Sequence, residues 1–369
     1  MKKIKLELTL LLGILFLLSN FVIAQEEIFY IGNRLGVGAR AMGMGGAHIA
    51  VAEDYTANYW NPAGLGQIRR MELQASFSHT QATNQATFFG NTSQDDISNT
   101  ELNSLGFVFP IPTYRGSLVF SLGFNRVRDF NYSLKFSGFN PHYAAYYDLT
   151  EFYTTVDDSV NQSETILESG GLKHWTLSGA VEVEKNFFVG ASLNLWSGKD
   201  EFSRRFKEED LLDIHNTYWE KITDQGDTLA YWDDFKKLEA RDNITSDFEA
   251  INLKIGALYR LNNFFRVGAT ITTPTVYTIE ENGTFYEEES FDGVSDIYYY
   301  DPDPTYTKYK IQEPYVFGLG AALSVANLLL AGDIEFQDWT QAKFMTDPPI
   351  KDVSKDEVNL RIKDNFRSG

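Results

Sequence analysis

The chain of 369 residues is 43% hydrophobic and 15% aromatic, a composition that argues against intrinsic disorder. It has no cysteine, which excludes disulfides, thiolate metal sites and a cysteine nucleophile, and its net charge of −19 argues against nucleic acid as a partner. The mean hydropathy is −0.28, and beyond the N-terminus no apolar run approaches the roughly 20 residues of a membrane helix.

Residues 1–24 have the pattern of a secretory signal peptide. Three lysines precede an apolar stretch from Leu8 to Leu18, and a small-residue cleavage site ends at Ala24. The alternative is a membrane anchor, for which the apolar stretch is short. The signal predicts export from a bacterial cytoplasm.

Residues 25–70 do not resemble strands and predict a compact coil. Gly43, Gly45 and Gly46 lie in a run of glycine and alanine, and such glycines allow tight turns and close backbone approach. The run has neither the spacing of a dinucleotide fingerprint nor the Gly-Lys-Ser/Thr of a phosphate loop. Asn61-Pro62 favours a turn or an extended backbone. A coil of this kind can fold inside a barrel lumen.

From Met71 onward the hydrophobic period is two. Trp175 and Leu177 lie on one face of a predicted strand, and His174 and Thr176 lie on the other. The alternating segments are about 7 to 13 residues long, near the roughly 9–11 that a tilted transmembrane strand needs. Further segments of this kind are 71–79, 103–109, 117–125, 187–195, 251–259, 264–273, 314–325 and 328–336.

Short and long connections alternate between these strands. The short turns are 110–116, 185–186, 262–263 and 326–327, and the long loops are 126–173, 198–247 and 274–313. A transmembrane barrel has short periplasmic turns and long extracellular loops, whereas a soluble sandwich usually has shorter strands. We therefore predict an all-β, antiparallel transmembrane barrel in the outer membrane of a Gram-negative bacterium.

Strand parity predicts four charged side chains on the lumen face, where they pair with acids or with the N-terminal segment. These are Lys254, Arg266, Glu182 and Asp333. Four aromatic residues in the predicted loop 274–313 are candidates for an entry groove for an apolar ligand, with internal packing of the loop as the alternative. These are Phe285, Tyr286, Tyr298 and Tyr299.

The predicted loops also carry most of the acidic charge. One interpretation is a divalent-cation site that bridges to lipopolysaccharide phosphates, and the favoured one is a solvated surface. The acidic groups are 208–210, 287–289, Asp301 and Asp303. Arg204, Arg205 and Lys207 could meet a carboxylate ligand, but pairing with Glu208 and Glu209 is the favoured interpretation.

Three segments together resemble the FadL/TodX family of outer-membrane transporters for hydrophobic compounds. Gly38 to Ala47, followed by Asn61-Pro62-Ala63, is similar to the family's hatch with its Asn-Pro-Ala motif. The other two segments are 265–275, a strand that ends in a proline, and 315–339. The resemblance extends over nearly all of the chain after the signal.

This resemblance implies a barrel of fourteen strands with an N-terminal hatch that plugs its lumen. Family members take up long-chain fatty acids or aromatic hydrocarbons without an energy source. The ligand moves from extracellular loops to a lumen site beside the hatch, and then leaves sideways near a kinked third strand. Asn61, Pro62 and Ala63 would take the role of the hatch motif.

The sequence therefore predicts a signal peptide at 1–24, a hatch at 25–70 and a barrel at 71–369. We count nine complete strands and one that begins near Val358, so the barrel is expected to be incomplete at its C-terminus. The implied partners are a hydrophobic ligand, outer-membrane lipid and lipopolysaccharide, and the barrel assembly machinery.

The residues do not predict an enzyme, a cofactor or a metal site. Five histidines are scattered without metal-ligand spacing, and no Gly-x-Ser-x-Gly elbow occurs. The predicted function is passive uptake of long-chain fatty acids or other hydrophobic compounds. The alternative is a scaffold or shuttle barrel of type IX protein secretion, in which the acidic loops would dock proteins.

Overall fold

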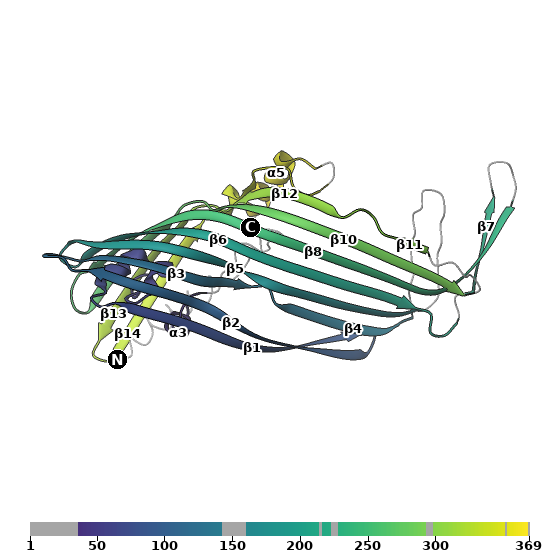
Figure 1. The fold of residues 1–369 in the computed structure, drawn as a ribbon, viewed down its shortest axis with the longest axis horizontal. Coiled ribbons are helices and arrows are strands. Elements are labelled where there is room, and N and C mark those ends of the chain that lie inside the picture. The colour runs from purple at the N-terminus through teal and green to yellow at the C-terminus, as the bar shows by residue number, and fades with distance from the viewer. Residues whose placement is uncertain are drawn as a thin grey trace, which may run out of the picture.

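The computed structural model is one antiparallel sheet of 15 strands, with short helices against it (Figure 1). It describes residues 36–141, 160–213, 216–222, 228–292, 298–350 and 353–367, so the predicted signal peptide lies outside the described residues. The prediction of an all-β antiparallel fold is confirmed. Among the described residues, no helix has the length and apolar character that crossing a membrane requires.

Nine successive strands pair along one end of the sheet, each antiparallel to the next. Four of the connections between them are the four predicted short turns, which are confirmed. No ladder joins the first of these strands to the last among the described residues. The nine are β1 (Glu72–Phe88), β2 (Asn91–Ile111), β3 (Leu118–Asp129), β5 (Val160–Glu184), β6 (Phe187–Glu209), β8 (Thr228–Arg260), β9 (Phe265–Thr272), β13 (Val316–Val325) and β14 (Leu328–Gln337).

The predicted long loops are largely strands, so their prediction as loops is wrong. Strands β5, β6 and β8 continue through them and are joined there by β4 (Tyr132–Asn140), β7 (Asn216–Ile222), β10 (Val276–Asp292), β11 (Tyr298–Tyr300), β12 (Thr305–Gln312) and β15 (Lys343–Phe344). We call the part of the sheet beneath the N-terminal helices the hatch half. The far half consists of β4, β10, β12 and the adjoining segments 160–171, 198–209 and 234–250.

The two halves have opposite polarity. On the outer face of the hatch half, apolar side chains are exposed, among them Leu319 (64%) and Ile334 (74%). Its inner face carries buried polar side chains such as Ser192 and Asn194. In the far half the apolar side chains are buried on the inner face. The buried cluster includes Val127, Phe130, Leu172, Tyr277, Ile279 and Ile311. On the outer face, charged side chains are exposed, among them Lys199, Glu201, Arg205, Glu280 and Lys308.

The strand ladder is interrupted at two places between the halves. Strand β3 ends at Asp129 and β4 begins at Tyr132, and the described part of β2 pairs with β3 only as far as Ser104 opposite Asn125. The second interruption separates β9 from β10 at residues 273–275, opposite residues 313–315 between β12 and β13. Each of these triplets has a central proline, which cannot donate to a ladder.

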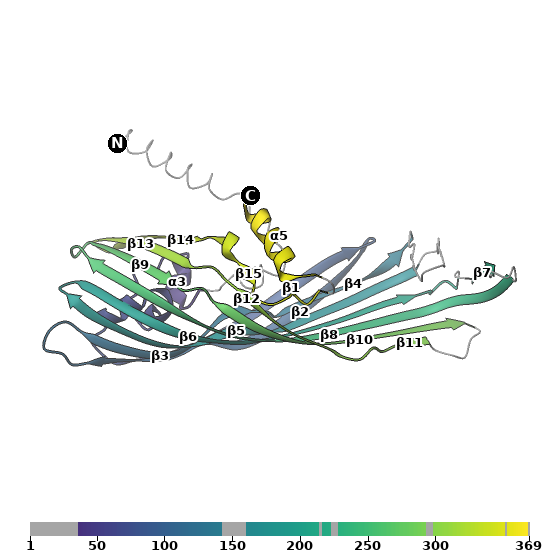
Figure 2. The ribbon, with the colours of Figure 1, turned by 90° about the horizontal axis from the view of Figure 1, so that it is seen from above.

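Five short helices complete the described structure. Three belong to the N-terminal segment and lie on the inner face of the hatch half (Figure 2). They are α3 (Ala39–Gly43), α4 (Ala57–Trp60) and the 3-10 helix η1 (Pro62–Gln67). The others are η2 (Trp339–Gln341) and α5 (Lys355–Arg367), which pack on each other.

The predicted strand near Val358 is wrong, because this residue lies within α5. Local helix signals outweigh a short apolar alternation here. Asp356 and Glu357 are in the first turn, where they complement the helix dipole. Arg361 donates to Glu357 at 2.6 Å in an i,i+4 pair.

Candidate functional site

The described part of the predicted hatch at 25–70, residues 36–70 and called the hatch below, is fixed to the sheet through Asn61. This side chain is fully buried. Its Nδ2 donates to the carbonyls of Ile49 (2.9 Å) and Ala257 (3.1 Å), and its Oδ1 accepts from the amide of Ala63 (3.1 Å). Asn61 thus caps η1 and joins two parts of the hatch to β8. A Cβ on Gly256 of β8 would lie 2.0 Å from Asn61 Oδ1, so this close approach requires glycine.

Tyr55 forms a second anchor of the hatch, over β2 and β3. Its ring lies over Gly106 and Gly123, where a Cβ would come within 1.6 Å and 1.9 Å of Tyr55 atoms. Its hydroxyl lies 3.1 Å from the carbonyl of Leu105 and 3.2 Å from Oδ1 of Asn125. The fully buried phenol is therefore paired at its polar end, as a buried tyrosine requires.

Both predicted lumen-facing cations contact the hatch. Lys254 Nζ donates to the carbonyl of Tyr59 at 2.7 Å and lies 5.2 Å from the centre of the Tyr59 ring. Arg266 Nη1 lies 2.9 Å from Glu53 Oε2. These two side chains hold the hatch against β8 and β9. Whether either contacts a ligand stays a prediction.

The two predicted lumen-facing acids also contact the hatch. Asp333 Oδ2 accepts from the amides of His48 (2.5 Å) and Ile49 (2.7 Å). Glu182 Oε2 lies 3.0 Å from Arg69 Nη2 at the end of the hatch. Together with the two cations, these acids attach the hatch to β5, β8, β9 and β14.

The predicted hatch glycines form a turn that faces a cavity. Gly43 ends α3, and Gly45 and Gly46 follow with φ angles of 68° and 83°, a region that favours glycine. Gly45 and Gly46 line this cavity, whereas Gly43 does not.

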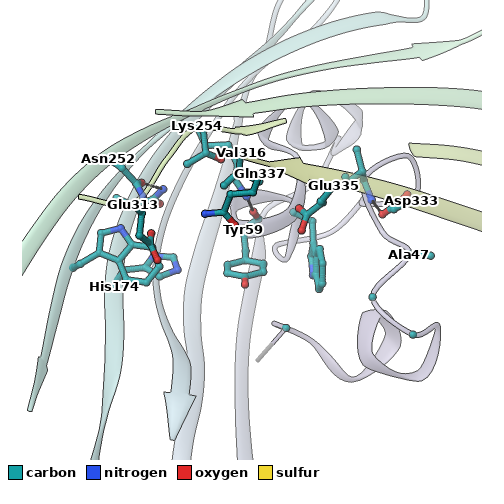
Figure 3. Close-up of a pocket in the computed structure, with 18 residues that line it drawn as sticks. Ala47, Tyr59, His174, Asn252, Lys254, Glu313, Val316, Asp333, Glu335 and Gln337 are labelled. Atoms are coloured by element: carbon teal, nitrogen blue, oxygen red, sulfur yellow. Dashed lines mark hydrogen bonds between the residues drawn. The ribbon is translucent and has the colours of Figure 1, made fainter. Parts of the chain in front are cut away.

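The hatch-side cavity has a volume of about 460 Å³ and lies between the hatch and the inner face of the sheet (Figure 3). Three large aromatic rings line it, those of Tyr59, Trp60 and Trp196. Its charged lining consists of Lys254 and three acids, Glu313, Asp333 and Glu335. His174 also lines the cavity, and its ring is 4.7 Å from that of Trp196 and 5.9 Å from that of Tyr59.

A second cavity, the apolar cavity, lies in the far half and has a volume of about 250 Å³. Its apolar lining is Phe130, Leu172, Phe248, Tyr277, Ile279, Tyr309, Ile311, Phe344 and Pro349. The rings of Trp196 and Tyr277, 6.1 Å apart, lie where the two cavities approach each other. Phe130 places the apolar cavity beside the interruption between β3 and β4.

The apolar cavity is also lined by two acids, Asp200 and Glu281. Burial and the neighbouring carboxylate of Glu168 raise the pKa of Asp200 to about 7. A nearby arginine, Arg128, opposes this shift of the pKa.

Arg126 spans the interruption of the third strand. It forms ion pairs with Glu101 of β2 and with Asp129 (3.2 Å), and it donates to the carbonyl of Gly170 in β5 at 2.6 Å. Asn131 donates to Glu101 at 3.3 Å. Polar side chains thus bridge the point at which the β2–β3 ladder ends.

The aromatic entry candidates line neither cavity. Phe285 and Tyr286 lie in β10, and Tyr298 and Tyr299 lie in β11, so they belong to strands and not to a loop. The Phe285 ring is 6.0 Å from that of Tyr300, and the Tyr286 hydroxyl donates to Glu288 at 3.0 Å. Packing between strands accounts for these two rings.

The three basic residues of segment 204–207 in the far half are paired with acids. Arg204 pairs with Glu164 and Asp242, Arg205 pairs with Glu239, and Lys207 pairs with Glu209. The predicted pairing with Glu208 and Glu209 is confirmed only for Lys207 with Glu209. It is wrong for Arg204 and Arg205, whose partners come from neighbouring strands. Glu208 was expected at a solvated surface, yet it is buried and accepts from Gln162 at 2.8 Å.

The sequence reasoning missed Phe130, Trp196 and Glu313 as cavity residues. Trp196 has the same strand parity as the buried Ser192 and Asn194, so its inward direction could have been predicted from the alternation. Phe130 and Glu313 lie at the two interruptions of the ladder, where alternation gives no direction.

Comparison with known proteins finds similar folds among solved structures. The toluene transporter TodX of Pseudomonas putida is 15% identical, with 84% of this chain and 73% of that chain covered and a TM-score of 0.49. The monoaromatic hydrocarbon channel CymD is 15% identical over 84% and 72%, with a TM-score of 0.44. The toluene transporter TbuX of Ralstonia pickettii is 14% identical over 84% and 88%, with a TM-score of 0.30.

No family model and no curated protein sequence matches the chain. At these identities and TM-scores the likeness assigns neither a family nor a ligand to this chain.

Proposed function

We propose that the chain forms an outer-membrane channel for the passive uptake of hydrophobic compounds. The observation that carries this proposal is the reversal of polarity along the sheet. Exposed side chains such as Leu177 (57%) and Leu319 (64%) suit contact with lipid, and the charged outer face of the far half suits water. The far half would then stand outside the cell, with the short turns in the periplasm.

The two cavities support a route through this channel. A hydrophobic compound would enter the apolar cavity in the far half and reach the hatch-side cavity past Trp196 and Tyr277. Phe130 lines the apolar cavity where the β3 ladder is interrupted, which supports a sideways exit from that cavity, with the hatch-side cavity as a site beside the route. The hatch motif 61–63 would close the passage toward the periplasm. Long-chain fatty acids as the substrate stay a prediction from the resemblance.

The placement can be tested with single cysteines, because the chain has none of its own. We expect an impermeant maleimide to label Lys308→Cys, in the far half, on intact cells. Asn263→Cys, in the turn between β8 and β9, should be labelled only after permeabilisation. Ile255→Cys, on the apolar outer face, should resist a water-soluble reagent. Labelling of Asn263→Cys on intact cells would overturn the proposed orientation.

Uptake can be tested with toluene as the probe, in cells that carry the full chain in the outer membrane. Pro62→Gly disturbs the start of η1, and we expect it to change the rate of uptake with the strands intact. The control is Pro304→Gly, in the connection between β11 and β12, away from the hatch. Equal uptake with and without the chain would overturn the channel proposal. A stoichiometric polypeptide on the purified protein would support the secretion scaffold.

A further inference from the structure

The hatch is joined to β14 through two adjacent residues, His48 and Ile49. Their amides both donate to the carboxylate of Asp333, at 2.5 Å and 2.7 Å, and the carbonyl of Ile49 accepts from Asn61 at 2.9 Å. The carbonyl of His48 accepts from the amide of Ala52 at 2.9 Å and so closes the turn that follows. This joint therefore connects the first part of the hatch, the Asn61 anchor and the sheet.

The sheet leaves little room at the joint. A Cβ on Gly318 would lie 2.7 Å from the side chain of Ile49, and a Cβ on Gly320 would lie 2.8 Å from it. A Cβ on Gly268 would lie 2.7 Å from the carbonyl of the same residue. The neighbouring His48 is fully buried. A charge that forms on its ring is therefore shielded from water unless the hatch moves.

Hydrogen bonding indicates which nitrogen of the His48 ring carries the proton. The hydroxyl of Thr56 donates to Oδ1 of Asp54 at 2.5 Å, so the hydroxyl oxygen is left as an acceptor. Nε2 of His48 lies 3.4 Å from this oxygen and is therefore the protonated nitrogen. Nδ1 is buried and has no hydrogen-bond partner among the residues that the structure describes. The joint thus holds a neutral imidazole.

Uptake of a second proton by this ring is unfavourable while the hatch is attached. The proton would go to Nδ1, where it would become a buried donor with no acceptor in the described part of the chain. It would also place a positive charge in a fully buried position. In a detached hatch the same ring is in water, where a histidine takes up a proton at about pH 6.5.

The charged groups around the ring leave this balance unchanged. Burial lowers the pKa of His48, and two neighbouring arginines act in the same direction. Two acids of the hatch oppose the shift of the pKa without cancelling it. The charged groups at the joint are Arg40, Glu53 and Asp54 of the hatch, Arg266 of β9, and Asp333 and Glu335 of β14.

We propose that His48 makes the attachment of the hatch sensitive to acid, so that the hatch leaves β13 and β14 when the ring takes up a proton. The neutral ring stabilises the attached hatch above about pH 6.5, and this stabilisation is lost as the pH falls from there toward the lower pKa of the buried ring. In the proposed channel, release of the hatch would open the passage to the periplasm. This regulation rests on the proposed channel function, whereas the acid-sensitive attachment does not.

Hydrogen exchange tests the attachment, with the full chain in nanodiscs. Exchange of the amides of residues 48–60 is measured from pH 8 to pH 5 and corrected for the intrinsic effect of pH on exchange, with the amides of β6 as the reference. Release coupled to one proton speeds exchange by at most about tenfold per pH unit. We expect a rise of about twentyfold, relative to β6, between pH 7 and pH 5.

Variants assign the effect to one ring. His48→Gln removes the titrating group and keeps a side-chain N–H as a donor, and we expect its exchange to be independent of pH over this range. The control is His79→Gln, which replaces an exposed histidine on β1 and should keep the profile of the parent protein. If His48→Gln fails to fold, the His48 ring of the parent is followed by NMR. It should stay neutral for as long as the hatch amides stay protected.

A flat profile of the parent between pH 7 and pH 5 would overturn the proposal. So would a rise in His48→Gln that equals the rise in the parent, or a protonated His48 ring in a hatch that stays protected. Toluene uptake that is faster at pH 5.5 than at pH 7.5 in the parent, and not in His48→Gln, would support the regulation. An acid-sensitive hatch in a chain without toluene uptake at any pH would remove the channel function and leave the attachment proposal standing.

Discussion

The hatch half and the far half are built from the same strands but have opposite faces buried. On β8, Ile251 and Ile255 are exposed outside the hatch half, and Asn252 is buried inside it. A few residues earlier on the same strand, Glu249 is exposed outside and Phe248 packs in the interior. The alternation continues unchanged, and only the chemistry assigned to each face is reversed. The same sheet therefore has an apolar outer face in the hatch half and a charged outer face in the far half.

The two halves gain their packing energy from different contacts. The far half has an apolar core shielded from water, as soluble proteins have. In the hatch half the interior is polar, and its side chains bond to each other and to the hatch, as Ser192 does with the carbonyl of Asn58 at 3.1 Å. Five experiments test this contrast between the halves.

The largest effect should come from the core of the far half. Phe130→Ala removes a side chain that is 7% exposed, and we expect a loss of about 3–5 kcal/mol in the free energy of unfolding. Phe120→Ala, on the outer face of the hatch half, should lose far less in a bilayer because lipid fills the space. Denaturant unfolding in lipid measures both. Equal losses would contradict the contrast between the halves.

A charge placed on the outer face should matter in only one half. Leu193→Lys introduces an ammonium group into the apolar belt, where it costs about 2–4 kcal/mol at the bilayer midplane. Ser203→Lys, on the same face of β6 in the far half, should change the free energy of unfolding very little. Folding yield into vesicles and unfolding in urea provide the measurements. If Leu193→Lys lowered neither the folding yield nor the free energy of unfolding, the outer face of the hatch half would not be in contact with the membrane.

Tight packing of the hatch should be sensitive to added volume. Gly256→Val forces its side chain against Asn61, and we expect a loss of about 1–3 kcal/mol together with protease access to the hatch. Gly332→Val is the matched control, since no atom lies within 4 Å of a Cβ built there. Resistance of the Gly256 variant to proteolysis would mean that the hatch does not need this contact.

The ion pair between Arg266 and Glu53 should show a moderate coupling. A double-mutant cycle with Arg266→Gln and Glu53→Gln is expected to give about 1 kcal/mol, because the arginine is half-buried and the glutamate also pairs with Arg40 at 3.1 Å. Thermal unfolding of the four proteins measures the coupling. Strictly additive effects would show that the pair does not hold the hatch.

The last experiment concerns acid stability in the far half. Burial alone would raise the pKa of Glu239, but hydrogen bonds from Arg205, Lys237 and Arg241 lower the pKa from its ordinary 4.5 to about 2. The stability that the ionised carboxylate contributes is present above pH 4.5 and is lost as the pH falls toward 2.

Glu239→Gln should therefore flatten the dependence of unfolding on pH in this range. The control is Glu249→Gln, an exposed acid on the same strand, which should keep the slope of the parent protein. Parallel slopes for the parent and the Glu239 variant would contradict the assignment.

Much of the hatch half could be predicted from the sequence, because there a single solvent fixes each face. Alternation placed Leu177 and His174 on opposite faces, and turn residues such as Asn186, with a φ angle of 67°, marked the hairpin ends. The far half could not be predicted in the same way. Its outer residues are charged, so its strands matched the composition of loops although cross-strand pairs such as Lys308 with Glu280 lie along the ladder.

The candidate site, too, could be predicted from the sequence only in part. Parity identified charged lumen residues such as Lys254 and Asp333, and it left open that both contact the hatch. The cavities depend on residues 130 and 313, at interruptions of the strands. Their surroundings are set by tertiary packing, which no local pattern encodes.

The attachment of the hatch has a consequence for the order in which the molecule folds. The hatch is synthesised before every strand, yet Asp333, which accepts from the amides of His48 and Ile49, comes 285 residues after the first of them. Contacts of such long range form late, because the intervening chain must be ordered first. The earliest part of the chain therefore completes its packing only after β14 is in place. A chain stalled before β14 would keep its N-terminal segment open to proteases, which gives quality control a simple signal of unfinished assembly.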